Sequence, residues 1–558
     1  MTIWKTPRRT APALLAAALG LSALCGPASA HVMPLIDRQI AAGSPHVVVA
    51  VVEGARTRWN EQRTLLFTDY SLRVEDRLRG DAPDRITLAI PGGTLDGQTH
   101  GTCVSTHLET GARYLLFLQD LDRPLLVPIT GGWQGVFKEV PGRQGKSLAL
   151  RGRRSPVEFS RLVRSTRELI RQVEADPRPE DTAWMREVED PSLPAKLYDP
   201  TPRSIPGGIV PALDEESESG LMAKEERPRF FVGTPAAAPL VFDPLPSDSP
   251  FSPADQEMLA YWNLYLKKPL FLVSSNPSPD WAYNNGISEI VGFPSSEEMR
   301  RQFGIPWFPG SYSAVFTVSG PDGRTVEIDI AMNPGRRWAV GDTQPDALFS
   351  REGTVFSFKS VVLQHLGTGW GYKGPYPPDN SPEDPAERTV DSIVGFGGFK
   401  YPTLLAVDAE AVRATFGGRP IRDGLVSPYA IYVSEGFLTY GHAAPVADSA
   451  QAGTSIQFTG AIKIENPGTV SLGRPTVEVY LVPERGSLDG AILLERIRVP
   501  GVLRSGQSRI VDLGSVTLPA DTPAGDYYFA YVLRDPRDAY QRNNRAWSYP
   551  GVPFTVTR

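Results

Sequence analysis

The apolar segment VVLQHLGTGWGYKG at residues 361–374 constrains the fold of this chain more than any other stretch. Its apolar residues are dense enough for a helix buried on most sides. The glycines that follow allow the positive φ angles at which helices commonly end. Residues four apart share one face of a helix, so Gln364 and Thr368 are expected to lie side by side, with His365 next to them. The segment therefore predicts a packed domain built around one buried helix that carries polar side chains.

The spacing of this segment resembles the metzincin metallopeptidase motif, His-Glu-x-x-His-x-x-Gly-x-x-His or Asp. On that motif Gln364 and Thr368 stand at the two ligand positions of the helix, and His365 stands at the position of the general base. Gly374 takes the third ligand position, and Gly371 coincides with the motif glycine at which the chain turns back. The resemblance implies a metzincin backbone from which the catalytic residues have been lost.

Other segments resemble landmarks of bacterial matrixin-like peptidases, in the order found in that family. They are AYWN at 260–263, DWAYNNGISEIV at 280–291, VEIDIAMNPGRRW at 326–338, DSIVGF at 391–396 and LAVDAEAVRATF at 405–416. The first implies the tryptophan of an opening helix, the next two imply strands, and the last implies a closing helix. Val394 stands where the methionine of the Met-turn would be. We therefore expect a degenerate, α+β matrixin-like domain over residues 229–440.

The resemblance implies no catalytic residue, no bound metal and no other cofactor. Zinc catalysis needs about three protein ligands and an open position for water. Of the six histidines in the chain, only His365 and His442 fall in or beside this domain. The alternative is a zinc metalloendopeptidase with an aberrant site. Its oxygen ligands would come from the nearby carboxylates, Asp379, Glu383, Asp384 or Asp391.

Residues 1–30 have the pattern of a secretory signal. Basic residues precede an apolar run at 13–24, and a small-residue cleavage site ends at Ala30. Cleavage after Ala30 would make the protein secreted or periplasmic and would leave Cys103 as the single cysteine, so no intrachain disulfide is expected. No later apolar run approaches the roughly 18 residues that span a bilayer. The net charge of −6 and the lack of a basic stripe argue against a nucleic-acid partner.

Short predicted strands with Gly and Pro turns fill residues 31–150 and favour a closed or nearly closed β-barrel. Their pattern resembles the OB-like modules that precede matrixin-like domains, which implies a structural or protein-contact role. Residues 151–228 are predicted to form a helix that packs on the barrel, followed by an acidic, Pro-rich linker.

Six alternating segments between residues 441 and 558 have the spacing of a β-sandwich. The stretches NPG at 466–468, TPAGDYYFAYVLRD at 522–535 and NN at 543–544 resemble the CARDB class of immunoglobulin-like adhesion domains. In that class the sandwich is a stalk or contact module. The sequence as a whole thus predicts a multidomain, exported pseudopeptidase. It would bind a protein, a peptide or a cell-envelope component, and the sequence does not identify which.

Overall fold

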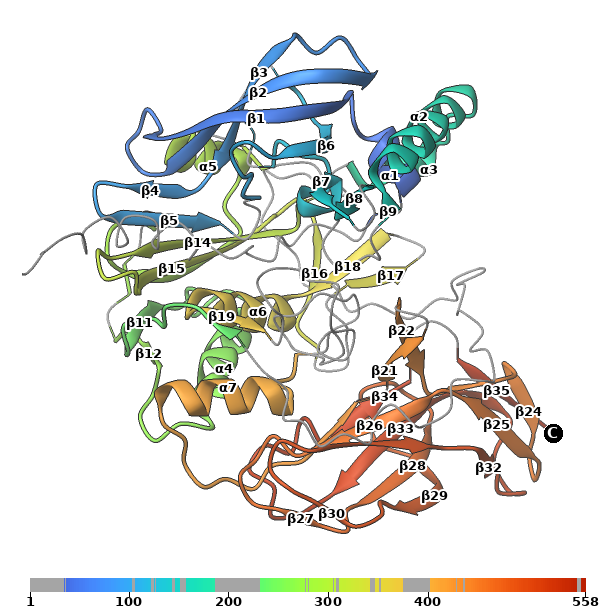
Figure 1. The fold of residues 1–558 in the computed structure, drawn as a ribbon. Coiled ribbons are helices and arrows are strands. Elements are labelled where there is room, and N and C mark those ends of the chain that lie inside the picture. The colour runs from blue at the N-terminus through green and yellow to red at the C-terminus, as the bar shows by residue number, and fades with distance from the viewer. Residues whose placement is uncertain are drawn as a thin grey trace, which may run out of the picture.

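A seven-stranded mixed sheet runs through the middle of the protein, in the order β12-β11-β13-β15-β14-β5-β4 (Figure 1). Its strands are β11 (Leu240–Asp243), β12 (Phe271–Val273), β13 (Ser288–Gly292), β14 (Ser313–Ser319), β15 (Thr325–Met332), β4 (Gly93–Leu95) and β5 (Gln98–Thr102). Strands β12, β11, β13 and β15 are parallel to one another, and β14 is antiparallel to β15. The sheet therefore combines strands from the centre of the sequence with a hairpin from the first domain.

The structure is a computed structural model. It describes residues 35, 37–102, 106–121, 125, 127–142, 146–150, 157–185, 231–275, 277–278, 281–304, 306–307, 311–341, 347–350, 353–374, 402–427, 429–434, 437–548 and 553–558. The chain is a β-rich multidomain protein with few helices. The predicted signal segment and Cys103 lie outside the described residues, as does almost all of the predicted acidic linker.

The first domain contains a second seven-stranded sheet, in the order β3-β2-β1-β6-β7-β8-β9. Its strands are β1 (His46–Trp59), β2 (Leu66–Arg79), β3 (Arg85–Pro91), β6 (Arg113–Leu118), β7 (Val136–Pro141), β8 (Ser147–Leu150) and β9 (Val157–Glu158). Its helices are α1 (Asp37–Ala42), α2 (Phe159–Ala175), α3 (Pro179–Thr182), η1 (Gly132–Gly135) and η3 (Ala183–Met185). Helix α2 packs on β2 and β8, as the predicted helix should.

The predicted barrel differs from this arrangement in two ways. Among the described residues β3 and β9 are the outer strands of the sheet, and no pairing between them closes it. The chain also leaves the sheet after β3, because Gly92 and Gly93 adopt φ angles of 106° and 141° at the predicted Pro-Gly-Gly turn. The hairpin β4–β5 that follows pairs with β14 of the central sheet instead, with four residue pairs from Phe316–Thr102 to Ser319–Thr99.

The central domain places its helices around the central sheet. They are α4 (Ser252–Asn263), α5 (Ser296–Phe303), α6 (Phe358–Gly369) and α7 (Ala406–Phe416). Two small sheets complete the domain, from β16 (Arg337–Ala339), β17 (Ala347–Ser350) and β18 (Gly353–Ser357), and from β10 (Phe231–Val232) and β19 (Tyr372–Gly374). Helix α4 begins at Ser252 with Phe251 as its N-cap. The Asp255 carboxylate lies inside this helix and accepts the Leu245 N–H at 2.7 Å.

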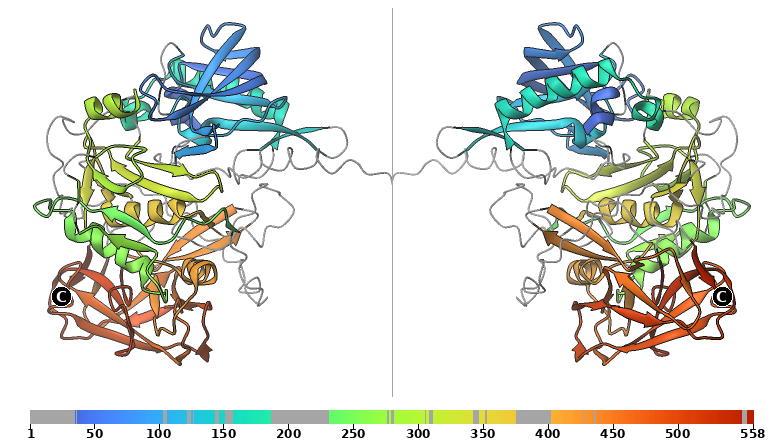
Figure 2. Two further views of the ribbon diagram at one scale, coloured as in Figure 1. Left: turned by 90° about the vertical axis from the view of Figure 1, so that its left-hand side faces the viewer. Right: turned by 90° about the vertical axis from the view of Figure 1, so that its right-hand side faces the viewer.

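The C-terminal domain is a β-sandwich whose first strand begins before the predicted boundary at residue 441. Its strands cover the six predicted segments and include others that were not predicted. They are β20 (Leu425–Ser427), β21 (Tyr429–Ser434), β22 (Phe437–His442), β23 (Ala444–Pro445), β24 (Ser449–Gln451), β25 (Ser455–Thr459), β26 (Ala461–Glu465), β27 (Leu472–Gly473), β28 (Thr476–Val482), β29 (Ile492–Arg498), β30 (Val502–Leu503), β31 (Ser508–Asp512), β32 (Ser515–Thr517), β33 (Gly525–Arg534), β34 (Arg545–Trp547) and β35 (Phe554–Thr557). One buried core joins residues of β26 and β31 to residues of β28 and β33. Figure 2 shows this domain at the opposite end of the molecule from the first domain.

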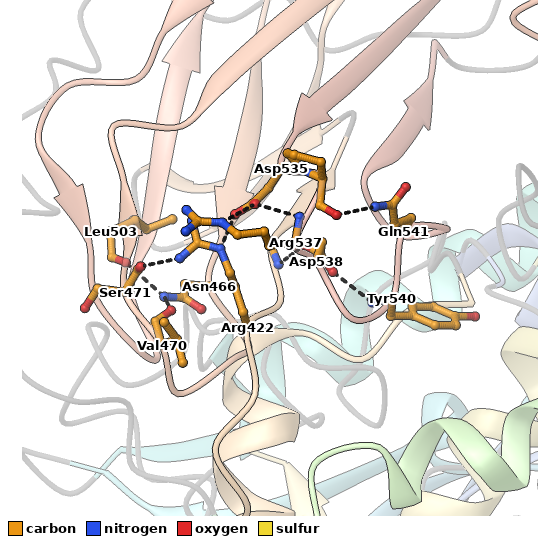
Figure 3. A network of polar contacts seen from close by, with 12 residues as sticks. Arg422, Asn466, Val470, Ser471, Leu503, Asp535, Arg537, Asp538, Tyr540 and Gln541 are labelled. Carbon is orange, nitrogen blue, oxygen red and sulfur yellow. Dashed lines mark hydrogen bonds and ion pairs between the residues drawn. The ribbon is translucent and has the colours of Figure 1, made fainter.

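Loops of the sandwich are tied together beside the central domain (Figure 3). Arg422 donates from Nε to Asp535 at 2.5 Å and from Nη1 to the Ser471 carbonyl at 3.1 Å. Asp538 accepts the backbone N–H of Tyr540 at 2.8 Å and that of Gly424 at 2.6 Å. These bonds fix the loop after β33 against the segment that enters the sandwich from α7.

The same loop reaches helix α4 and forms a polar joint between the two domains. Buried Asp423 accepts hydrogen bonds from the Tyr265 hydroxyl and from the Asn543 amide, the latter at 3.0 Å. Glu257 of α4 accepts the Tyr540 hydroxyl at 2.9 Å and pairs with Lys359 of α6 at 2.7 Å. Because these groups are largely withdrawn from water, losing one partner would leave others unpaired. The sandwich is therefore joined to the central domain by specific contacts.

Candidate functional site

Helix α6 forms where the apolar segment predicts it and lies across the central sheet. The Ser357 hydroxyl accepts the Ser360 N–H at the first turn, which is an ordinary N-cap. Every described side chain of the helix except Thr368 is buried. The helix comes close to β15 at Gly369, where a Cβ would lie 2.6 Å from the Ile328 side chain. This helix is thus a core element of the central domain.

His365 has a packed environment and a hydrogen-bonding partner on the sheet. Its side chain is 0% exposed, and Nε2 lies 3.0 Å from the hydroxyl of Ser313, the first residue of β14. An imidazole held in this way is positioned by the protein interior, as expected for a structural histidine.

Gln364 and Thr368 lie one helical turn apart, on the same face of α6, as predicted. The buried oxygens Oε1 of Gln364 and Oγ1 of Thr368 have no hydrogen-bond partner among the described residues. Neutral amide and hydroxyl oxygens are weak zinc ligands in comparison with imidazole or thiolate.

Three aromatic side chains pack against one another at the C-terminal end of α6. Trp370 stacks on Tyr372 at 5.2 Å between ring centroids, and Trp262 of α4 meets both rings edge-on. The Trp262 Nε1–H donates to the Leu363 carbonyl of α6 at 3.1 Å. The helix tryptophan that the resemblance implied therefore packs directly against the helix of the predicted motif.

The glycine of the motif turns the chain as predicted. Gly371 has a φ of 100°, and a Cβ at this position would lie 2.6 Å from the Thr234 carbonyl oxygen. Gly374, predicted at the third ligand position, ends β19 and pairs with Phe231 of β10. Val394, Asp379, Glu383, Asp384 and Asp391 lie outside the described residues.

We expect Gly371→Ala to lower the free energy of unfolding by about 1–3 kcal/mol, because the new side chain meets backbone at a φ that favours glycine. Urea unfolding followed by circular dichroism measures the difference. Gly417→Ala is the matched control for backbone strain, since Gly417 has a φ of 85° but open space around its Cβ position. Equal losses in the two variants would show that the Thr234 contact contributes nothing.

A second polar cluster, which the sequence reasoning missed, lies on the opposite face of the central sheet from α6. Four carboxylates that are at least nine-tenths buried occupy adjacent strands: Asp243, Glu289, Glu327 and Asp329. We call them the carboxylate row. The signal in the sequence is the alternation VEIDIA at 326–331, which puts Glu327 and Asp329 on one face of a strand whose other face is apolar.

Burial raises the pKa values of Glu289, Glu327 and Asp329. The pKa of Glu289 rises to about 7, mainly through burial and also through the Asp243 charge. Burial, followed by the neighbouring Glu327 carboxylate, raises the pKa of Asp329 well above its ordinary range. Burial also raises the pKa of Glu327, although the interaction with Asp329 and hydrogen bonds from backbone amides act to lower it.

In the part of the chain described by the structure, no group of three or more His, Cys, Asp or Glu residues is placed to hold a metal ion.

No helix among the described residues is long and apolar enough to cross a membrane.

No family model matches the chain, and no curated protein matches it. Several solved structures show a similarity. The CARDB domain of the PF1109 protein of Pyrococcus furiosus, in a solution NMR structure, is 12% identical, with 25% of this chain and 98% of that chain covered and a TM-score of 0.16.

The crystal structure of the same CARDB domain in complex with di-metal ions is 16% identical and covers 25% of this chain and 90% of that chain, with a TM-score of 0.15. The C-terminal domain of wzt is 15% identical and covers 25% of this chain and 80% of that chain, again with a TM-score of 0.15. These neighbours are similar to a quarter of the chain. The β-sandwich at its C-terminal end is established by its own strand pairing and its buried core.

Proposed function

We propose that this chain is an exported, non-catalytic binding protein whose central domain has a matrixin-like, metzincin fold without peptidase chemistry. The observation that carries the proposal is the burial of the side chains of helix α6. The helix carries the segment whose sequence resembles a zinc-binding helix, yet its side chains are packed into the domain interior. An active site of this kind needs ligands that face an open, water-filled position.

The order of the elements supports the metzincin-like part of the proposal. Trp262 lies on the opening helix α4, strands β13 and β15 follow, and Asn333 begins the turn that follows β15. Helix α6 then crosses the sheet, and α7 closes the domain close to its predicted bounds. Each of these elements falls on a segment that resembles the family in sequence.

The residues at the remnant site support the absence of catalysis. A general base must reach the water that it activates, and His365 is instead fully buried beside Ser313. Gln364 and Thr368 replace the two helix ligands with neutral oxygens, which do not offset the desolvation of a zinc ion as imidazoles do. Both the Lewis acid and the base of the family mechanism would therefore be lost.

We propose a protein, a peptide or a cell-envelope component as the partner, reached after export by way of the predicted signal segment. The C-terminal sandwich would act as a contact module. The joint at Asp423 and Glu257 supports this role, because a rigid attachment holds both domains in one orientation toward a partner.

The test is the metal content and the proteolytic activity of the purified protein. We expect zinc well below one equivalent by elemental analysis, no cleavage of unfolded casein, and no effect of a chelator on either result. His365→Ala and Gln364→Ala should leave both measurements unchanged. One equivalent of zinc together with chelator-sensitive cleavage, reduced in both variants, would contradict the proposal and support the metalloendopeptidase alternative.

A further inference from the structure

The carboxylate row is ordered by the register of the central sheet. Asp243 pairs with Glu289, and Glu289 pairs with Asp329, so these three side chains project from the same face of three neighbouring strands. Glu327 lies two residues before Asp329 on β15 and shares that face. Adjacent strands are about 4.8 Å apart, so the carboxyl groups are neighbours in a region that excludes water.

The loop between β12 and β13 covers the row and bonds to it through backbone amides. Glu327 accepts the N–H of Asn284 at 2.5 Å and that of Gly286 at 2.6 Å. Glu289 accepts the Ala282 N–H at 3.2 Å, and Asp243 accepts the Ser278 N–H at 2.6 Å. We call residues 281–287 the covering loop. Asn284 and Gly286 hold positive φ angles of 61° and 80°, which aim successive amides at Glu327.

The charge of the row is not balanced by basic side chains in the described part of the chain. No ion pair found there includes Asp243, Glu289, Glu327 or Asp329. Asp329 is 0% exposed; its Oδ1 accepts the Glu289 N–H at 3.1 Å, and its Oδ2 has no donor among the described residues. Interaction with the neighbouring carboxyl group raises the pKa of Asp329 and lowers that of Glu327, as a proton on Asp329 shared with Glu327 would do. Two carboxyl groups can bond to each other only when one of them carries a proton.

We propose that Asp329 Oδ2 is a proton-binding site, and that its proton, donated to Glu327, holds the covering loop and with it the first domain on the central sheet. Glu327 then remains a carboxylate that accepts three hydrogen bonds, one from Asp329 and two from the loop. If the proton is lost, the Asp329 and Glu327 carboxylates face each other without water. The repulsion between them is relieved when Glu327 moves away from Asp329, which displaces the covering loop bonded to Glu327.

The covering loop is the element through which the row reaches the first domain. The Tyr283 ring lies edge-on to His100 of β5 at 5.4 Å, and its hydroxyl donates to the Thr317 carbonyl of β14 at 3.2 Å. The Trp281 carbonyl accepts Gln302 of α5 at 3.2 Å, and the Gln302 carbonyl in turn accepts the Thr64 hydroxyl of the first domain. A loosened loop would therefore weaken two contacts between the domains.

The groups that face this region set the direction of the pH dependence. They are Asp243, Glu289, Glu327, Asp329, Tyr283 and His100. Burial lowers the pKa of His100 to about 4, so its imidazole stays neutral above that pH. The pKa values of Asp329 and Glu289 are raised on folding, so their contribution to stability is complete below the ordinary carboxyl range. That contribution is lost progressively as the pH rises from the ordinary carboxyl range up to the raised folded values, which for Glu289 is about 7.

Hydrogen exchange of the full chain tests the proposal. Corrected for intrinsic exchange, protection of the Asn284 and Gly286 amides should fall by up to about tenfold per pH unit as the pH rises from the ordinary carboxyl range, about 4, toward the raised pKa of Asp329, and should level off above that pKa. Asp329→Asn supplies an amide hydrogen in place of the proton, so its loop protection should fall less steeply with pH, and the remaining dependence should come from Glu289. Its infrared spectrum should also lack one protonated carboxyl band.

Asp255→Asn is the matched control, because burial raises the pKa of Asp255 to about 7 but its carboxyl group bonds within helix α4 and the preceding segment. The pH dependence of loop protection should survive in this variant. Wild-type protection that does not change as the pH rises above about 5 would overturn the proposal whether or not the variants fold. An unchanged pH dependence in Asp329→Asn would also overturn it.

Discussion

Trp262→Ala is expected to lower the free energy of unfolding by about 3–5 kcal/mol, the range for truncating a large buried aromatic side chain. Trp262 is 0% exposed, meets Trp370 and Tyr372 edge-on, and donates its indole N–H to the Leu363 carbonyl. The variant would lose this packing and leave a cavity between α4 and α6. Urea unfolding monitored by circular dichroism gives the difference.

Trp262→Phe separates the contribution of the hydrogen bond from that of the packing. It keeps much of the aromatic contact and loses the donor to Leu363, so its loss should be clearly smaller than that of the alanine variant. Lys268→Ala, at an exposed position before β12, should fall within about 0.5 kcal/mol of the wild type. A loss below about 1 kcal/mol for Trp262→Ala would mean that α4 and α6 do not share a core.

Asp423→Ala should cost about 2–5 kcal/mol, because the Tyr265 hydroxyl and the Asn543 amide would lose their buried acceptor at the joint. The joint links α4 to the sandwich, so the loss should include weaker coupling of the two domains. Differential scanning calorimetry is the suitable measurement. The wild type should unfold these domains in one transition, and the variant should separate them into two.

Asp423→Asn is the matched variant of similar shape. Burial and the neighbouring Asp538 carboxyl raise the pKa of Asp423 well above its ordinary range. An amide at this position keeps an acceptor and supplies a donor toward Asp538 without a proton. We therefore expect its stability at pH 7 to be close to that of the wild type. A loss equal to that of the alanine variant would show that the negative charge of Asp423 is itself required.

Local patterns predicted the elements of the central and C-terminal domains well. The apolar density at 361–374 predicted α6, and the positive φ of Gly371 confirms the predicted turn. The resemblance of residues 326–338 predicted β15, and alternation predicted the main strands of the sandwich. These signals depend on residues a few positions apart, where side-chain direction follows from helix or strand geometry alone.

The contacts that join the domains could not be predicted in this way. Strand β5 meets β14 more than 200 residues later in the chain, and nothing in its local pattern identifies its partner. The carboxylate row likewise arises only when three separate strands come into register. Single acidic residues within strands look like ordinary solvent-facing positions, so their burial cannot be predicted from the local pattern.

The hairpin β4–β5 also has a consequence for the ancestry of the protein. Its two strands are encoded within the first domain, but they complete the sheet of the second through the four residue pairs between β5 and β14. A recombination event that exchanged the first domain as a cassette would remove an edge of its neighbour's sheet and expose unpaired backbone that promotes aggregation. The two domains are therefore expected to have been inherited together. The linker predicted between them would by itself suggest that they could recombine independently.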